Sequence, residues 1–170
     1  ELNGKPTRWL LKDPSHIGHI AEILKEYPNA KFIHIHRDPI ESVGSFCSLT
    51  KNVRLAFSKK ISTHDIGETV IDFWNHNLEK GMSDRKSLSN NQIVDIQYSE
   101  FIKNPLDHIK NTYMQLNFDM TIATENKIQN YLIKDKQILK PSHNYSLDEY
   151  GLNEKIIKSE FRDYMLNYDF

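Results

Sequence analysis

The segment from Lys31 to Ser48 constrains the fold more than any other part of the chain. It reads K-F-I-H-I-H-R-D-P-I-E-S-V-G-S-F-C-S. Its first residues form a β-branched and aromatic run that is typical of a strand. After the break at Arg37, apolar residues recur at helical spacing. Asp38 suits an N-cap and Pro39 suits the first helical position. The segment therefore predicts a strand, a tight turn and a helix, with Arg37 in the turn.

A turn of this kind favours anions. Backbone N–H groups at a helix N-terminus and a neighbouring guanidinium both attract negative charge. Ser45 follows Arg37 by eight residues, two turns into the predicted helix. The two side chains could therefore hold one phosphate together. The alternative is an ordinary strand–helix turn whose arginine makes a surface ion pair.

The preceding segment predicts a second strand beside the first. Residues 8–12 read R-W-L-L-K, which is typical of a short buried strand, and a helix with Ser15 as its N-cap is expected over 16–27. Strand, helix and strand imply a right-handed crossover and parallel pairing. Lys12 and Arg37 would then lie at the carboxyl ends of neighbouring strands, where open α/β sheets bind ligands.

The rest of the chain alternates between helices and one more strand. A loop or short helix is expected over 52–64, a long helix over 65–88, a strand over 92–98, and helices from 104, from 121 and over 153–164. His34 and His36 share one face of the strand over 31–36. Because no third ligand stands at a diagnostic spacing, they are interpreted as packed or hydrogen-bonded histidines, and no metal is predicted.

Composition excludes several functional classes. The chain has 170 residues, enough for one domain with a real core. Its net charge of −1 provides no overall field that would recruit nucleic acid or an anionic membrane. No apolar run approaches the ~20 residues that span a bilayer. The single cysteine, Cys47, excludes an internal disulfide and is expected to be a core thiol.

The motifs together resemble the PAPS-dependent sulfotransferases, whose sulfonate donor, PAPS, is 3′-phosphoadenosine 5′-phosphosulfate. R-D-P-I-E-S-V-G-S is similar to the segment of that family that binds the 3′-phosphate, and K-D-P-S-H to the K-[DS]-P motif of its tyrosylprotein-type and bacterial members. Q-Y-S-E-F-I-K-N-P and the tail H-N-Y-S-L-D-E-Y-G-L also resemble family segments. The resemblance implies an α/β, P-loop-like sulfotransferase fold with a short parallel sheet of about three strands flanked by helices.

The resemblance also implies roles for individual residues. Lys12 matches the lysine that approaches the transferring sulfonate. His16 is the candidate catalytic base, although its spacing from Lys12 is four residues where the cytosolic enzymes have two. His16 could also simply start the helix.

Four further residues are implied to bind the cofactor. Arg37 and Ser45 match the pair that grips the 3′-phosphate. Tyr98 matches a tyrosine near the adenine, with local packing at the strand end as the alternative. Lys140 could close over a phosphate, with a solvated loop as the alternative.

The function implied is transfer of a sulfonate from PAPS to a hydroxyl or amine acceptor, without a metal. The family carries its 5′-phosphosulfate loop and an N-terminal strand ahead of these motifs, and this sequence holds no such glycine-rich loop. We therefore expect residues 1–170 to form one incomplete domain. Two alternatives stay open: a catalytically inactive, sulfotransferase-like interaction module and a fragment related to P-loop kinases. The identity of the acceptor and the oligomeric state are left open, and the cytoplasm is favoured over the Golgi lumen.

Overall fold

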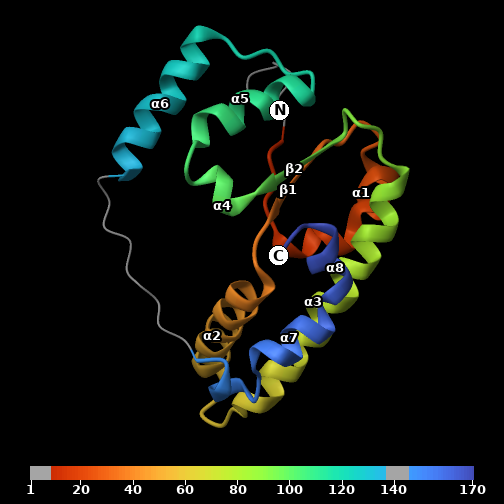
Figure 1. Ribbon diagram of the computed structural model, residues 1–170, viewed down its shortest axis with the longest axis vertical. Helices are drawn as coiled ribbons and strands as arrows, with labels where there is room; N and C mark the ends of the chain where they lie inside the picture. The colour runs from red at the N-terminus through yellow and green to blue at the C-terminus, as the bar shows by residue number, and fades with distance from the viewer. Residues whose placement is uncertain (1–8, 137–145) are drawn as a thin grey trace.

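The computed structural model describes residues 9–136 and 146–170. Its centre is a two-stranded sheet, with helices on both sides (Figure 1). Strand β1 (Phe32–His36) pairs in parallel with β2 (Ile93–Gln97). The α/β architecture and both of these strands confirm the sequence prediction.

The third predicted strand is wrong over the described part of its range. Residues 9–13 have no regular secondary structure, and Trp9, Leu10 and Leu11 are exposed by 81%, 90% and 66%. A strand needs a ladder of hydrogen bonds with a neighbour, and in the described residues β1 forms its ladder with β2. In the described residues, therefore, no crossover connects a strand over 9–12 to β1.

The helix expected over 16–27 begins earlier and has two parts. A 3-10 helix, η1 (Pro14–His19), leads into α1 (Ile20–Glu26). The cap is Asp13 rather than the predicted Ser15, because Asp13 Oδ1 accepts a hydrogen bond of 2.8 Å from the Ser15 N–H. A carboxylate at this position satisfies a helix N–H group that has no partner inside the helix.

The predicted turn after β1 is confirmed. Asp38 caps helix α2 (Pro39–Phe57), its Oδ1 accepting a 2.8 Å hydrogen bond from the N–H of Ile40, and Pro39 is the first helical residue. The helix continues through Phe57, whereas a loop or short helix was expected from residue 52.

Helix α3 (Thr63–Asp84) is the longest element and supports η1. Gly18 and Gly81 permit this close approach. A Cβ on Gly81 would lie 2.5 Å from the backbone oxygen of Ile17, and one on Gly18 would lie 1.9 Å from the side-chain oxygen of Asn77. Two small residues thus hold the segment that carries Lys12 and His16 against α3.

The remaining helices are shorter than α3. They are η2 (Arg85–Ser87), α4 (Tyr98–Phe101), α5 (Pro105–Gln115), α6 (Ile122–Lys136), η3 (Asp148–Tyr150), α7 (Glu154–Glu160) and α8 (Arg162–Asn167). Figure 1 shows α4 and α5 near β2 and α7 beside α2 and α3. The predicted helix over 153–164 is divided at Phe161 into α7 and α8.

The main core lies between α2, α3 and the C-terminal helices and contains Val43, Cys47, Ile66, Ile157 and Phe161. Cys47 is fully buried, and burial raises the pKa of its thiol to about 11. This confirms the prediction of a core thiol. A smaller core of Val94, Ile96 and Leu116 joins β2 to the end of α5.

Candidate functional site

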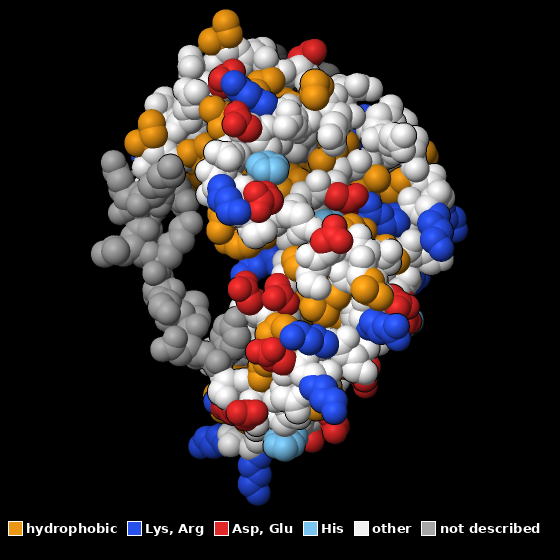
Figure 2. Space-filling view, in the orientation of Figure 1, with side chains coloured by type: hydrophobic (Ala, Val, Ile, Leu, Met, Phe, Trp, Pro, Cys, Tyr) orange, Lys and Arg blue, Asp and Glu red, His pale blue; other side chains and the backbone are white. Residues whose placement is uncertain are grey.

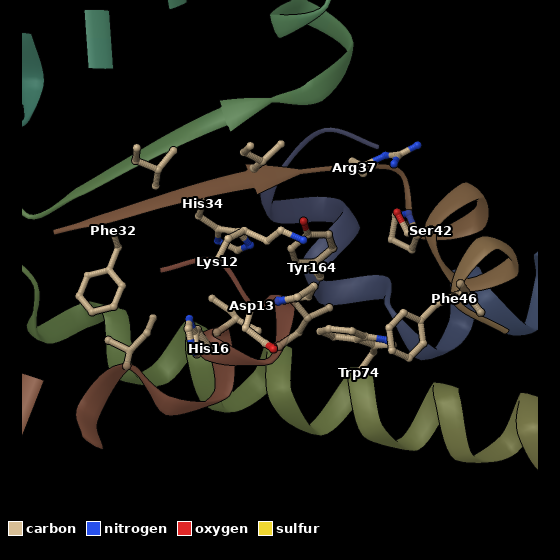
Figure 3. A pocket seen from close by; sticks show the side chains of 18 of the residues that line it. Lys12, Asp13, His16, Phe32, His34, Arg37, Ser42, Phe46, Trp74 and Tyr164 are labelled. Carbon is tan, nitrogen blue, oxygen red and sulfur yellow. The ribbon is translucent and has the colours of Figure 1, made fainter. Parts of the chain in front are cut away.

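A cavity of about 540 Å³ lies between β1, η1 and the first turns of α2 (Figure 3). Four of the six predicted site residues line it. They are Lys12, His16, Arg37 and Ser45. Most of the remaining lining is apolar and comes from Ile17, Ile20, Phe32, Phe46, Trp74 and Leu78. A few polar groups therefore face a largely apolar wall, which is the usual composition of a small-molecule site.

Arg37 follows the last residue of β1, and its side chain is 44% exposed. Its Cζ lies 4.3 Å from the centroid of the Tyr98 ring, and its Nη2 lies 3.7 Å from a carboxylate oxygen of Glu41. Contact with an aromatic face and an acidic group restricts the guanidinium without burying it. Tyr98 does not belong to the lining of the cavity. Its predicted place beside an adenine stays a prediction.

Lys12 and His16 lie on the wall of the cavity that is opposite α2. Figure 3 shows the Lys12 side chain beneath β1, while the Arg37 guanidinium lies at the end of the strand and points away from it. Lys12 thus shares the cavity with Arg37, although the strand expected to carry it is not formed. His16 lies in η1, whose Asp13 cap has its pKa held below the usual range by hydrogen bonds from the side chain and backbone of Ser15.

Ser45 is exposed and lines the cavity from the second turn of α2. Ser42, one turn nearer Arg37, lines it too. The sequence reasoning missed Ser42, although its spacing of three residues from Ser45 places both hydroxyls on one side of a helix. The start of α2 thus carries two hydroxyl groups and a guanidinium.

A buried polar cluster lies on the histidine face of β1. His36, only 1% exposed, has its Nε2 2.7 Å from Asp95 Oδ1 and its Nδ1 2.9 Å from the hydroxyl of Tyr164. Arg85 donates to Asp95 and to the Tyr168 hydroxyl. The prediction that His36 is a hydrogen-bonded histidine is confirmed.

Charge and burial shift the pKa values of several groups in this cluster. Burial first, then the nearby His36 and Arg85, lowers the pKa of His34 to about 3, so that its ring is neutral at pH 7. Burial acts to raise the pKa of Asp95, but hydrogen bonds from His36 and Arg85 outweigh it and hold this pKa well below its usual range. Burial raises the pKa of Tyr164.

His34, His36 and Asp95 also bring one ligand atom each within 4.8 Å of one another, the geometry of a possible metal site. Arg85 already occupies this region as a cation. Its Nη1 lies 3.3 Å from His34 Nδ1, and its Nη2 donates to Asp95 Oδ2. A guanidinium in contact with two of the three ligands would repel a metal ion, so hydrogen bonding is the better interpretation of the group.

The sequence reasoning missed Asp95, Arg85, Tyr164 and Tyr168 in this cluster. One signal was present: Asp95 interrupts the apolar strand I-V-D-I-Q, and a charged residue on a strand face that is otherwise buried needs a partner. Lys140 lies outside the described residues. Figure 2 shows acidic and basic side chains intermixed over the visible face, without one basic patch. In the described part of the chain, no helix is both long and apolar enough to cross a membrane.

The sulfotransferase family model matches residues 2–121. Among curated proteins, the omega-hydroxy-beta-dihydromenaquinone-9 sulfotransferases Stf3 of Mycobacterium bovis and Mycobacterium tuberculosis are each 26% identical over 148 residues, which is 84% of this chain. The chain spans about a third (35%) of the length of these relatives.

Solved structures agree with the family match. Sulfotransferase STF9 of Mycobacterium avium superposes with a TM-score of 0.81 at 28% identity, over 97% of this chain and 43% of that one. Sulfotransferase STF1 of Mycobacterium tuberculosis gives a TM-score of 0.79 at 26% identity, over 92% and 40%. A sulfotransferase domain from the curacin biosynthetic pathway, 13% identical with a TM-score of 0.51, shares the fold. The family match covers well over half of the sequence, and the chain belongs to the sulfotransferase family.

Proposed function

We propose that this chain is part of an enzyme that transfers a sulfonate from PAPS to a hydroxyl group of an acceptor. The observation that carries the proposal is that Arg37 and Ser45, at the start of α2, line the same cavity as Lys12 and His16. A guanidinium, a hydroxyl and a helix N-terminus together suit a phosphate dianion. An ammonium and an imidazole on the facing wall suit the chemistry of group transfer.

Each side chain has a defined task in this scheme. Arg37 and Ser45 bind the 3′-phosphate and so orient the donor. The acceptor oxygen attacks the sulfur, the bond from sulfur to the 5′-phosphate oxygen breaks, and adenosine 3′,5′-bisphosphate leaves. Lys12 stabilises the negative charge that develops on the oxygen of that breaking bond. His16 accepts the proton that the acceptor hydroxyl loses.

We further propose that the acceptor is an apolar alcohol. The cavity walls formed by Ile17, Phe46 and Trp74 would favour a hydrocarbon rather than a sugar or a charged peptide. The two curated relatives are named for an omega-hydroxy-dihydromenaquinone, which is an alcohol of this kind. The relatives found are bacterial, and they lend no support to a Golgi location.

The first test is calorimetric titration of the chain with adenosine 3′,5′-bisphosphate and, as the control without a 3′-phosphate, with adenosine 5′-monophosphate. We expect markedly tighter binding of the bisphosphate. Equal affinities would contradict the proposed 3′-phosphate site.

Arg37→Ala should weaken bisphosphate binding by ~2–4 kcal/mol, because a charge-assisted contact is lost. Arg162→Ala is the matched control, since Arg162 is an exposed arginine that does not line this cavity. If the two variants bind equally well, Arg37 does not hold the 3′-phosphate.

Lys12→Ala tests the transition-state role in the whole protein. The turnover of sulfonate transfer should fall far more than affinity for the bisphosphate. A loss confined to binding would remove Lys12 from the chemical step. The sulfotransferase family match argues against the kinase-related alternative. An inactive interaction module would instead bind neither nucleotide in the titration above.

A further inference from the structure

We propose that Asp95, His36 and Tyr164 form a hydrogen-bonded positioning chain that fixes the backbone of Arg37 at the start of the anion-binding turn. The inference rests on the proposed function, because it assigns a supporting role to residues behind the 3′-phosphate site. It concerns positioning residues, since none of the three is proposed to touch the reacting atoms.

Three contacts make up the positioning chain. Asp95 Oδ1 lies 2.7 Å from His36 Nε2, and His36 Nδ1 lies 2.9 Å from the hydroxyl of Tyr164. A backbone hydrogen bond from Arg37 acts to lower the pKa of the same hydroxyl, and Arg37 directly follows His36 in the sequence. The contacts run from β2 through β1 to α8 and back to the residue that follows β1.

With a neutral His36 ring, one arrangement of protons satisfies every donor and acceptor. Asp95 is ionised, because its pKa lies well below the usual range, so it can only accept. His36 must therefore donate through Nε2, which leaves Nδ1 of a neutral ring as an acceptor. Tyr164 then donates its proton to Nδ1 and keeps its oxygen free to accept from Arg37. Every group in the positioning chain then has a complementary partner.

Burial makes the positioning chain rigid. His36 and Tyr164 are 1% and 8% exposed, so that neither can replace its partner with water at low cost. The ring of Tyr168 stacks on His36 with centroids 3.7 Å apart, and Arg85 holds the second oxygen of Asp95. The imidazole therefore has little freedom to turn away from Tyr164.

This rigidity matters because the Arg37 side chain is itself 44% exposed. A long, half-exposed side chain places its guanidinium reproducibly only if its backbone is fixed. Tyr164 also lines the cavity. The helix α8, which is distant in sequence from the turn, thus sets the position from which Arg37 reaches the phosphate.

The test compares Tyr164→Phe with Tyr168→Phe. Both variants delete one hydroxyl from the same aromatic cluster and keep the ring, but the Tyr168 hydroxyl contacts Arg85 and Met82 and forms no contact with Arg37 that the structure records. Two measurements are made on each: amide hydrogen exchange at Arg37 by NMR, and the ratio of the affinities for adenosine 3′,5′-bisphosphate and adenosine 5′-monophosphate.

In Tyr164→Phe we expect exchange at Arg37 to accelerate about threefold to tenfold, the effect of one lost hydrogen bond, with the affinity ratio falling by a similar factor. Tyr168→Phe should leave both unchanged. Equal changes in the two variants, or unaltered exchange at Arg37 in Tyr164→Phe, would overturn the proposal. So would an unprotected Arg37 amide in the wild-type chain, a result that needs no variant to fold.

The two proposals fail differently. If the wild-type chain does not distinguish the two nucleotides, the proposed function is wrong, and the exchange data still decide whether Tyr164 fixes the backbone of Arg37. If the nucleotides are distinguished but Tyr164→Phe keeps the full ratio, the 3′-phosphate site stands and the positioning chain is wrong.

Discussion

The two faces of β1 reverse the usual distribution of polar and apolar side chains. His36 is 1% exposed and the His34 side chain 15%, whereas Ile33 and Ile35 on the opposite face are 47% and 48% exposed. Adjacent residues of one strand thus lie in very different surroundings. The histidines are the buried pair and the isoleucines are the half-exposed pair.

The neighbouring elements account for the difference. On the histidine face, η2 and α8 bring Arg85, Tyr164 and Tyr168 against the strand. On the isoleucine face, Leu116 packs on β2 but leaves β1 open. The polar face can be buried because its groups are paired, and within the described residues no buried side-chain nitrogen or oxygen lacks a partner. Burial here follows the available partners rather than hydrophobicity.

Among tests of the contrast between the two faces of β1, His36→Ala should have the largest effect. This change removes a donor from Asp95 and an acceptor from Tyr164 and leaves a cavity, so we expect a loss of ~2–4 kcal/mol in the free energy of unfolding. Urea denaturation followed by circular dichroism measures it. A loss below that of Ile35→Ala, the next residue along and on the opposite face, would show that the polar cluster contributes little.

A smaller loss in the free energy of unfolding is expected at the contact between η1 and α3. These two elements support the cavity wall that faces β1. Gly81→Ala would place a methyl group 2.5 Å from the backbone oxygen of Ile17, and separating the two elements should cost ~1–3 kcal/mol. Glu79→Ala, at an exposed position of the same helix, is the control. If thermal melts show equal stability in both variants, then η1 does not depend on this close approach.

Lowering the pH should reduce the free energy of unfolding through the groups on the histidine face of β1. Burial, His36 and Arg85 lower the pKa of His34 from 6.5 to about 3 in the folded chain. As the pH falls, His34 therefore binds a proton in the unfolded state but not in the folded state. The stabilisation is complete above pH 6.5 and is lost progressively as the pH falls toward 3. Asp95, opposite it, keeps its charge throughout this range and loses its stabilising effect only at pH values below its unfolded pKa of 3.8.

Between pH 7 and pH 5 the free energy of unfolding should fall by about 1–2 kcal/mol through His34 alone. Denaturant titrations at several pH values measure the slope. His34→Gln should flatten it, whereas His76→Gln, at an exposed position of α3, should leave it unchanged. A slope that is unaffected by His34→Gln would show that the imidazole is not buried in solution.

The sequence predicted best where the signals were local. Asp38 and Pro39 marked the start of α2 through backbone chemistry that depends on a few neighbouring residues. Tyr164 and Arg85 were missed because they reach His34 and His36 only after α3 and α8 fold back on the sheet, and no spacing along the chain encodes that contact. Trp9 and Leu10 were assigned to a strand on their composition, but a strand also requires a partner, which composition does not specify.

The smallest effect is expected on the isoleucine face. Ile35→Ala removes a side chain that is already 48% exposed, so the free energy of unfolding should fall by about 1 kcal/mol or less. Urea denaturation at two protein concentrations measures this. A larger loss at the higher concentration only would mean that a second copy of the chain covers this face. A large loss at both would mean that the face is buried within one chain, and the contrast between the two sides of β1 would not hold in solution.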